Sequence, residues 1–600
     1  MKINNLRSKP LAVALAAIGL ACANPAAAFK FEMDNGLTGT FDSTFSFGLQ
    51  RRMKSPDRSI IGNDSGGSTP VQSPLGTLVN GPGMGYTASP DFNYAQTDDG
   101  DLNYKKGDIV SAVVKGTHEL FVKEGGNWAA LGRFTWSSDF QADKTRRTPL
   151  DDEAKKAVQQ NVTLLDLWVS KEIRLGDNAA KLKLGNQVIS WGEDIFIIGG
   201  INSINALDLR KIHIPGVQLK EIFVPAPMLS LASGLGGGFS MEAYYQFAWN
   251  KFILDPSGTF WSSADFLGKG GKRGAFIPTS VMDPLYAGGT PLGTFGDFDP
   301  TRGRSLGYLA NSAGPGLGTI VPVDITSPKN GGQYGFNLRF KPKEADTEYA
   351  AYYIRYHDKL PFVGFKYDPA TTNVINIRAV EQYGEDKDLY GLSMNTKVGD
   401  WAVGAELSYR PRDSVAIDPT VPLSGKYSYF SSAFGGPTAY TVNGYKDERK
   451  WQAHLTGFKL FEPAIPAALH AAEGYFMAEA AVTRYPGLQL DGSVPYLLNN
   501  YTLPSKNSWG YVMEFGLTYA NIFGSGWTMS PVLDFYHDVS GVSPNTIPFV
   551  EGRKALALGL NFDYHNALKA TLGYSSFFGG GNLNMMRDRD VLTASVSYTF

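Results

Sequence analysis

Apolar and polar residues alternate along this chain at every second position, and this period restricts its fold more than any other feature. Between Leu37 and Gln50, the odd positions are mainly leucine and phenylalanine, whereas the even positions are mainly threonine and other polar residues. Successive side chains of a strand point to opposite faces, so this period predicts a strand with one apolar face. The pattern recurs from Phe239 to Trp249, from Trp509 to Tyr519 and in many other segments, which predicts an all-β protein.

The connections between the expected strands alternate between short and long. Counting the alternating segments gives about 18 strands, within a range of about 14 to 20. They begin near Leu37, Ile109, Trp128, Val162, Ala180, Val217, Phe239, Gly332, Thr347, Lys387, Trp401, Glu448, Gly474, Ser508, Trp527, Arg553, Leu568 and Val591. Tight turns such as 176–179 and 399–400 follow even-numbered strands, and long connections such as 51–107 and 250–331 follow odd-numbered ones.

This segregation is typical of a membrane-spanning barrel. Such barrels have short periplasmic turns and long extracellular loops, whereas a soluble two-sheet protein has no reason to separate its loops in this way. We therefore expect a transmembrane antiparallel β-barrel that occupies residues 29–600 as one domain. The long loops either fold into the lumen as a constriction or form an extracellular canopy, and both interpretations stay open.

Residues 1–28 have the pattern of a secretory signal peptide. Basic residues at Lys2, Arg7 and Lys9 precede an apolar run and a small-residue site that ends at Ala28, which predicts cleavage after Ala28. An acylated Cys22 is the alternative, but Gly19 stands where a lipoprotein signal has leucine. Beyond this segment no run approaches the roughly 18 uncharged apolar residues of a membrane-spanning helix.

The sequence ends on a strand pattern, Val591–Phe600, with phenylalanine as the final residue. This segment resembles the C-terminal signal by which the outer-membrane assembly machinery recognises its barrels. Together with the signal peptide it predicts the outer membrane of a Gram-negative bacterium, with outer-membrane lipids and that machinery, engaged through the Phe600 strand, as partners. A net charge of -2 gives no indication of nucleic-acid binding.

Charged residues on the polar faces are expected to line the barrel interior. The residues that we assign to the lumen are Arg133, Asp166, Arg339, Arg355, Glu406, Glu514 and Asp534. Alternation adds Lys181, Lys183, Lys397, Asp42, Glu242, Glu479 and Asp538. Neither sign dominates, so the sequence does not favour a strongly anion- or cation-selective pore.

Catalytic and metal-binding motifs are missing from the sequence. It has no nucleophile elbow, HExxH motif, P-loop or dinucleotide fingerprint, and its seven histidines are scattered. The acidic run Asp98–Asp101 resembles the start of a calcium-binding loop, but the remaining ligands of such a loop do not follow it. An ordinary turn is therefore favoured. We expect no enzyme activity, no cofactor and no bound metal.

A polar and aromatic segment between Leu184 and Gly216 interrupts the alternation. It holds the candidate functional residues Gln187, Trp191, Glu193, Asp194, Asn205 and Asp208. Carboxylates and amides beside a tryptophan, within turn-forming residues, either bind a ligand or clamp a loop against the barrel wall. Both interpretations stay open.

The chain resembles the domain-of-unknown-function family "thirteen hundred and two", large outer-membrane-type proteins of Gram-negative bacteria. The matching stretches are Leu37–Gly48, Asp98–Asn103, Gly185–Asp208, Pro215–Pro225 and the strand that ends at Phe600. The resemblance implies genomic neighbours of two kinds, an RND-type transporter and a LolB-like periplasmic lipid carrier. It therefore implies the trafficking of lipid-like or hydrophobic molecules at the outer membrane.

These observations lead to a ranked set of functions. The first is an outer-membrane channel or transporter for a hydrophobic or amphiphilic organic compound, working with periplasmic and RND-type partners. A general diffusion porin is the alternative and would have an open, water-filled lumen. An outer-membrane hydrolase, which would need a converging serine, histidine and acid, and a surface structural protein are further alternatives.

Overall fold

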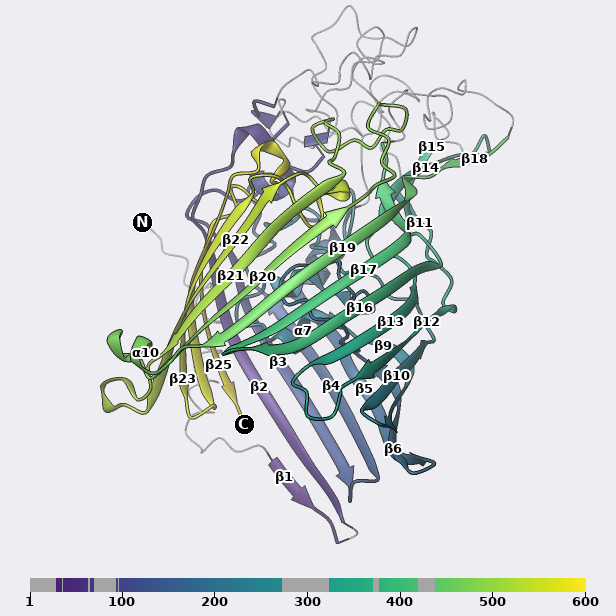
Figure 1. Cartoon of the computed structure of the whole chain (residues 1–600). Helices are drawn as coiled ribbons and strands as arrows, with labels where there is room; N and C mark the ends of the chain where they lie inside the picture. Colours follow the sequence, from purple (N-terminus) through teal and green to yellow (C-terminus); the bar gives the residue numbers. More distant parts are fainter. Residues whose placement is uncertain are drawn as a thin grey trace, which may run out of the picture.

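Eighteen antiparallel strands form a closed β-barrel (Figure 1), which confirms the predicted fold class and strand number. The computed structural model describes residues 29–34, 36–62, 65–69, 93–94, 96–271, 323–370, 377–418 and 438–600. The barrel strands are β2 (Leu37–Arg52), β3 (Ile109–Glu124), β4 (Trp128–Asp139), β5 (Asn161–Leu175), β6 (Asn178–Gln187), β9 (Ala226–Gly236), β10 (Phe239–Gln246), β12 (Gln333–Phe340), β13 (Glu348–Tyr356), β16 (Lys387–Val398), β17 (Trp401–Ala416), β19 (Tyr445–Leu460), β20 (Glu473–Arg484), β21 (Asn507–Thr518), β22 (Trp527–Ser540), β23 (Lys554–Tyr564), β24 (Leu568–Phe578) and β25 (Val591–Thr599).

The first and last barrel strands close the ring. β2 pairs with β25 from Thr44 opposite Thr599 to Arg52 opposite Val591. Phe600 continues this pairing, because its N–H donates to the Ser43 carbonyl at 3.0 Å and its own carbonyl accepts from the Ser43 N–H at 2.9 Å. Below that point the short strand β1 (Phe29–Glu32) pairs with β2 instead. Closure leaves no unpaired edge between the ends of the sheet.

The connections define two different rims. Two-residue turns join β5 to β6, β9 to β10 and β16 to β17 at the short-turn rim, whereas the opposite, long-loop rim carries 53–108 and 247–332. One strand begins later than predicted, since β9 starts at Ala226 rather than near Val217. Residues 219–222 instead form the helical turn α7, whose start carries a reciprocal capping box between Gln218 and Glu221. The predicted signal peptide and its predicted cleavage site lie outside the described residues.

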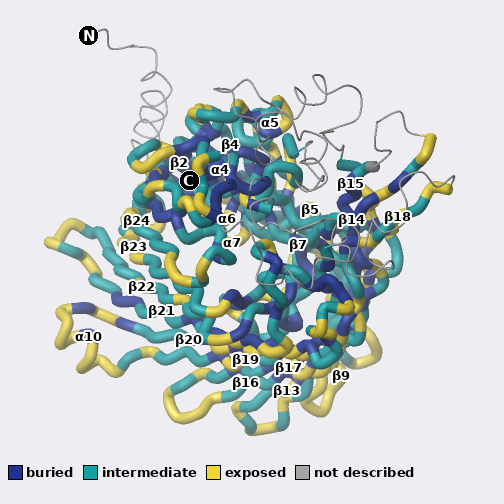
Figure 2. The backbone as a smooth tube through the Cα atoms, turned by 90° about the horizontal axis from the view of Figure 1, so that it is seen from above, coloured by how far each residue is buried: buried dark blue, intermediate teal, exposed yellow. Residues whose placement is uncertain are grey.

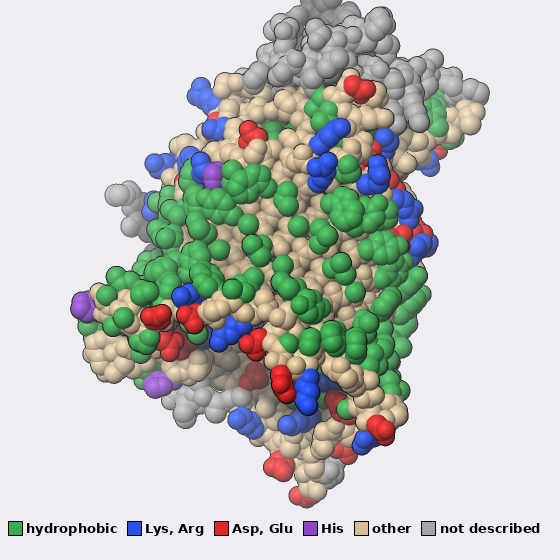
Figure 3. All heavy atoms as spheres, viewed as in Figure 1, with side chains coloured by type: hydrophobic (Ala, Val, Ile, Leu, Met, Phe, Trp, Pro, Cys, Tyr) green, Lys and Arg blue, Asp and Glu red, His purple; other side chains and the backbone are tan. Residues whose placement is uncertain are grey.

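The wall is apolar on its outer face and polar on its inner face. In β12, Tyr334, Phe336 and Leu338 are 40%, 52% and 39% exposed, whereas the alternate residues Gln333 and Asn337 are buried. Figure 3 shows hydrophobic side chains spread over the outer surface of the viewed wall. This polarity is the reverse of a water-soluble protein and matches the lipid-facing band of a membrane barrel.

The remaining elements lie in the connections. A small sheet of β11 (Val323–Ile325), β15 (Ile377–Gln382), β14 (Phe362–Tyr367) and β18 (Tyr440–Val442) lies at the long-loop rim (Figure 1). The other described elements are β7 (Ala206–Leu207), β8 (Phe223–Val224), α4 (Asp99–Leu102), α5 (Asp152–Gln159), α6 (Leu209–Ile212), α7 (Leu219–Ile222), α10 (Ala464–Ala468) and the 3-10 turns η1 (Arg58–Ile60), η5 (Ile522–Gly524), η6 (Pro544–Thr546) and η7 (Gly581–Leu583). None of the helices in the described ranges is long and apolar enough to span a bilayer.

Candidate functional site

The connection between β6 and β9, residues 188–225, folds into the barrel, and we call it the inward segment. Figure 2 shows α6, α7 and β7 of this segment within the ring of strands. Its apolar residues Trp191, Ile201 and Ile204 are buried in one cluster with Tyr352 and Ile354 of β13. One side of the segment is therefore packed against the wall as a hydrophobic core.

Two wall carboxylates hold the first half of the inward segment by its backbone. Glu406 of β17 accepts hydrogen bonds from the N–H groups of Glu193 at 2.7 Å and Ile201 at 2.9 Å. Glu479 of β20 accepts from the three consecutive N–H groups of residues 195–197 at 2.5–3.1 Å. Hydrogen bonds to an ionised acceptor are stronger than neutral ones, so these two carboxylates, the tether carboxylates, fix the path of the chain.

Glycine makes the close approach to Glu406 possible. A Cβ on Gly192 would lie 2.5 Å from one Glu406 carboxylate oxygen, and one on Gly200 would lie 2.0 Å from the other. Gly192 also has a φ of +97°, a conformation that other residues rarely adopt. The glycines of this sequence motif thus leave room for a carboxylate in contact with the backbone.

Further polar side chains of β17 and β19 complete this attachment. Arg410 donates to the Gly200 carbonyl and the Ser203 hydroxyl, both at 2.6 Å, and Gln452 donates to the Ile198 carbonyl at 3.0 Å. His454 lies 2.6 Å from Glu479 through its Nδ1 atom. Nothing in the sequence distinguishes Arg410 or His454 beyond their place in alternating strands.

The second half of the inward segment is attached to the opposite side of the ring. Lys115 of β3 donates to both carboxylate oxygens of Glu221 in α7, at 2.6 and 2.8 Å, and the pair is buried. Pro215 packs against β2, where a Cβ on Gly48 would lie 2.7 Å from it. Because β2 and β3 are about half the ring away from β17 and β20, the inward segment crosses the lumen.

Four of the predicted site residues make polar contacts within this segment or beside it. Trp191 donates its indole N–H to Glu242 at 2.6 Å, and Gln187 donates to the Met228 carbonyl at 2.9 Å. The Asn205 side chain bonds to both the N–H and the carbonyl of residue 189. The Asp208 carboxylate pairs with Arg210 at 2.7 Å. Of these contacts, that of Trp191 joins the segment to another strand of the wall, and the two predicted roles, ligand binding and loop anchoring, stay predictions.

The two adjacent acidic residues of the segment lie beside the tether carboxylates. Glu193 accepts a hydrogen bond from the Asn395 side chain at 2.9 Å. Burial, and then the charges of Glu406 and Glu479, raise the pKa of Asp194 to about 8. The inward segment therefore places a protonatable carboxyl next to its own attachment points.

The predicted lumen residues fall on both faces of the wall. Arg133 pairs with Asp166 and with Glu119, both at 2.6 Å, and Lys220 of the inward segment also reaches Glu119. The other predicted residues on inward-facing positions are Arg339, which pairs with Glu348 at 3.4 Å, Glu406, Glu514, which accepts from Tyr475 at 2.6 Å, and Asp534, opposite Glu514 in the ladder.

The prediction for Arg355 is wrong. Arg355 lies opposite Tyr334 in the ladder, on the outward face with the exposed Tyr349, and it pairs with Asp388 at 3.1 Å. Its neighbours Ile354 and Tyr356 point inward, into the apolar cluster under the inward segment. Because this strand is apolar on both faces, polarity could not tell which face is the lumen.

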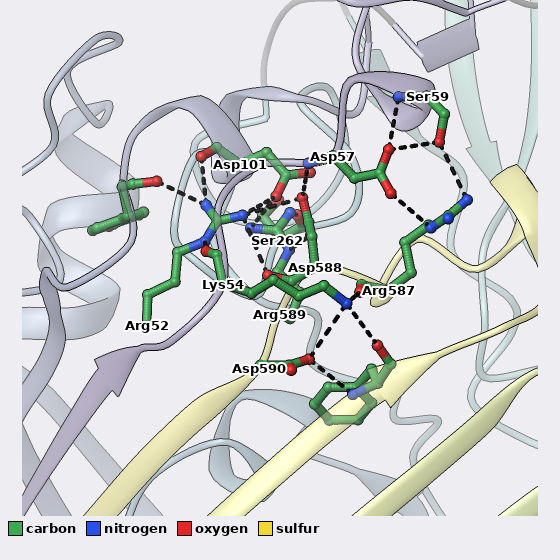
Figure 4. Close-up of polar contacts among 12 residues, drawn as sticks. Arg52, Lys54, Asp57, Ser59, Asp101, Ser262, Arg587, Asp588, Arg589 and Asp590 are labelled. Atoms are coloured by element: carbon green, nitrogen blue, oxygen red, sulfur yellow. Dashed lines mark hydrogen bonds and ion pairs between the residues drawn. The ribbon is translucent and has the colours of Figure 1, made fainter.

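A second buried polar site lies at the long-loop rim (Figure 4). Arg52 at the end of β2 pairs with Asp101 at 3.0 Å and Asp588 at 3.1 Å, and Arg589 pairs with Asp101 at 3.2 Å. We call these four buried residues the rim cluster. Both guanidinium groups lie over the Phe260 ring. The acidic run that suggested calcium therefore pairs with arginine and joins the first long loop to the last.

Neither a metal centre nor a catalytic set is found in the described ranges. No group of three or more potential metal ligands occurs there. A serine and a histidine do meet, Ser43 and His118 at 2.9 Å, but His118 lies among the outward rings of Phe41 and Phe134. The other nitrogen of His118 accepts from the Trp136 indole, so this pair is part of the lipid-facing wall.

Comparison with protein families assigns the chain to one group. The family described as "Protein of unknown function (DUF1302)" matches residues 9–600. The chain belongs to this family. The match covers the whole barrel and the inward segment. No curated protein matches the sequence significantly.

Several solved structures align along most of the chain. Pseudomonas aeruginosa OpdK with vanillate is 9% identical, with 93% of this chain and 98% of that chain covered and a TM-score of 0.36. Acinetobacter baumannii OccAB2 is 9% identical, with 94% and 98% covered and a TM-score of 0.39. A BenF-like porin from Pseudomonas fluorescens Pf-5 is 10% identical, with 95% and 99% covered and a TM-score of 0.38.

Proposed function

We propose that this protein is an outer-membrane channel for hydrophobic or amphiphilic organic compounds, with a lumen that the inward segment narrows. The observation that carries the proposal is the path of the inward segment, which runs from Glu406 and Glu479 on one side of the ring to Lys115 on the other. The apolar outer face of the barrel supports a place in the outer membrane of a Gram-negative bacterium. The short-turn rim then faces the periplasm and the long-loop rim faces the medium.

A mixed lining beside the inward segment supports an amphiphilic solute. A cavity of about 300 Å³ lies between this segment and β6, β9 and β10. Its charged lining residues Lys181, Lys183 and Glu242 stand beside the apolar Val188, Ile189 and Ala232. A solute with a polar and an apolar part finds partners for both here, whereas a simple aqueous pore has no need of the apolar side chains.

Conductance in a planar bilayer tests the proposal. We expect small conductance for the wild-type protein and at least a fivefold increase for the double variant E406A/E479A, because the inward segment loses both tether carboxylates. The matched control is E473A, since Glu473 is an exposed carboxylate on the same strand as Glu479.

Two outcomes would overturn the proposal. High, ohmic conductance of the wild-type protein that the double variant leaves unchanged would indicate a general diffusion porin. No conductance from either protein would favour a surface structural role. The periplasmic lipid carrier, the RND-type transporter and the assembly machinery at Phe600 stay predictions, which site-specific crosslinking from the short-turn rim and from β25 in cells would test.

A further inference from the structure

A second, larger cavity lies at the long-loop rim, away from the inward segment, and we call it the rim cavity. Its volume is about 470 Å³, within the range of roughly 300–1,000 Å³ that is usual for small-molecule sites. Seven separate parts of the chain form it: the loop after β2, the loop after β10, strand β14 with the residues before it, the end of β17, Gly444 before β19, the loop after β20 and the turn η6.

The walls of the rim cavity belong to two apolar clusters. On one side, Phe266 and Val363 pack with the cluster of Phe365, Tyr367 and Ala379 in the small rim sheet. On the other side, the end of β17 and the loop after β20 form a second cluster that contains Val415, Ile417, Tyr485, Leu488, Val494 and Tyr496. The cavity is thus the space between two packed surfaces rather than a gap among polar loops.

The polar groups at the rim cavity are held by the protein itself. Asn545 accepts from the Ala416 N–H at 2.7 Å and donates to the Ser414 carbonyl at 3.0 Å. Asn93 donates to the Asn499 carbonyl at 2.9 Å. These amides fix the loops in place, so the shape of the cavity is largely preformed.

Charge distinguishes the rim cavity from the lumen below it. Among the described residues that line it, Asp418 is the one side chain that carries a formal charge at neutral pH, and no lysine or arginine is present. A few residues down the same strand, the buried Arg410 and the partly buried Asp413 lie beside the buried Lys450 of β19. An anion that enters the rim cavity would lose water without gaining a counter-charge, which is unfavourable, and a cation would gain at most the one carboxylate of Asp418.

We propose that the rim cavity binds an uncharged apolar organic molecule, with an aromatic or alicyclic ring system as its main part. The cavity takes this molecule from the medium before it reaches the charged lumen. The binding step stands on the cavity alone, whereas the onward passage of the molecule rests on the proposed channel function.

Protection of an engineered cysteine tests the binding step. The sequence contains one cysteine, Cys22, in the segment predicted to be removed, so a new thiol reports its own site. Ser263 lines the rim cavity and is exposed, and S263C keeps its size. The control variant is S68C, at an exposed serine of the same rim that does not line the cavity.

Three probes with the same ring separate size from charge: naphthalene, 2-naphthoate and 2-naphthylmethylammonium. We expect saturating naphthalene to slow maleimide labelling of S263C at least fivefold, the two ions to slow it less than twofold, and S68C to be unaffected. Equal protection by all three probes, or none by naphthalene, would overturn the proposal. Protection by 2-naphthoate alone would overturn it as well, since it would indicate a carboxylate site.

A variant that fills the cavity provides a second, independent measurement. Ala264 lines the cavity, and A264W should weaken naphthalene binding at least tenfold, as measured by quenching of naphthalene fluorescence in nanodiscs. The control is A468W, at an exposed alanine of α10 on the other rim. Unchanged binding in A264W would overturn the proposal.

The two proposals fail separately. If naphthalene protects S263C but E406A/E479A conducts like the wild type, the cavity binds its ligand and the channel proposal is wrong. If the double variant opens the lumen but naphthalene binds no more tightly than its ions, the channel proposal stands and the rim cavity is not the binding site.

Discussion

Two tether carboxylates hold the inward segment, whereas two arginines and two aspartates hold the first and last loops together in the rim cluster. Glu406 and Glu479 accept hydrogen bonds from backbone N–H groups, so the attached segment contributes no counter-charge of its own. In the rim cluster, Arg52 and Arg589 face Asp101 and Asp588 and all four are buried. The rim cluster is thus an interlocked set of ions, and the tether is a set of separate hydrogen bonds.

The two kinds of attachment differ in the free energy that the loss of one contact costs. Removing one ion from a buried pair leaves its partner charged and dehydrated, which typically costs about 3–5 kcal/mol. Losing a hydrogen bond to a charged group costs less, about 1.5–3 kcal/mol. Losing a single contact of the tether therefore costs less free energy than losing a single ion of the rim cluster.

The largest effect is expected when the rim cluster is broken. R52M leaves Asp101 and Asp588 with one arginine, so we expect the free energy of unfolding to fall by about 3–5 kcal/mol. The measurement is chemical unfolding of the detergent-solubilised barrel, followed by its heat-dependent mobility on a gel. K54M is the control because the neighbouring Lys54 side chain is partly exposed, and its loss should cost less than about 1 kcal/mol.

A change below about 1 kcal/mol in R52M would contradict this reading of the rim cluster. It would mean that the two aspartates find other partners once Arg52 is gone. The rim and lumen sites would then be held by interactions of similar strength.

The next effect concerns how the tether carboxylates work together. E406Q and E479Q should each speed proteolysis of residues 193–201, because an amide is a weaker acceptor than a carboxylate. The two act on the same stretch of chain, so their effects should be non-additive by about 0.5–3 kcal/mol. E479Q combined with R52M should instead be additive within about 0.5 kcal/mol, since the two sites are far apart.

Additive effects of E406Q and E479Q would show that the segment can leave one carboxylate while it stays on the other. The inward segment would then be held at two independent points rather than as one unit. Strong coupling between E479Q and R52M would show that the rim and the lumen form a single cooperative structure.

A smaller effect is expected from pH, through Asp194. Its pKa in the folded protein is raised to about 8 from an ordinary value of 3.8, so the protonated form favours the folded state. The stability that protonation contributes is fully present below about pH 4 and is lost as the pH rises through about 8. Conductance should therefore increase between pH 6 and pH 9, as Asp194 ionises beside Glu406 and Glu479.

The variant D194N should flatten this pH profile, because it cannot ionise. D177N is the matched control, since Asp177 is an exposed residue in the turn between β5 and β6. A conductance that rises equally with pH in D194N would show that another group governs the response.

Alternation predicted the barrel because each strand must present one face to lipid. It placed all strand starts within a few residues except the sixth, where α7 follows Val217 and hides the true start at Ala226. The clamp residues near Trp191 stood out as a break in the pattern. Among their wall partners, Glu242, Glu406 and Glu479 were predicted only as lumen charges and Arg410 was not predicted, because a contact such as that from Arg410 to Gly200 joins positions 210 residues apart.

The smallest effect is expected at Arg355, which belongs to a third group of charges. Arg355 pairs with Asp388 and Asp386 on the outer face, where its side chain is 29% exposed. Exposed pairs contribute about 0–1 kcal/mol, so R355Q should change the free energy of unfolding by less than about 1 kcal/mol. It should also leave the reversal potential in a salt gradient unchanged, because an outward charge does not meet the permeating ions.

The inward-facing Arg339 is the matched comparison for Arg355. R339Q removes a positive charge from the lumen wall, so the reversal potential should shift toward cation preference. If R355Q shifted it as much as R339Q, then Arg355 would face the lumen and its outward placement would be wrong. If only R339Q shifts the reversal potential, then a charge affects ion selectivity only where it faces the lumen. The effect of a charged residue in this barrel then depends on the face where it lies as well as on its ion-pair partners.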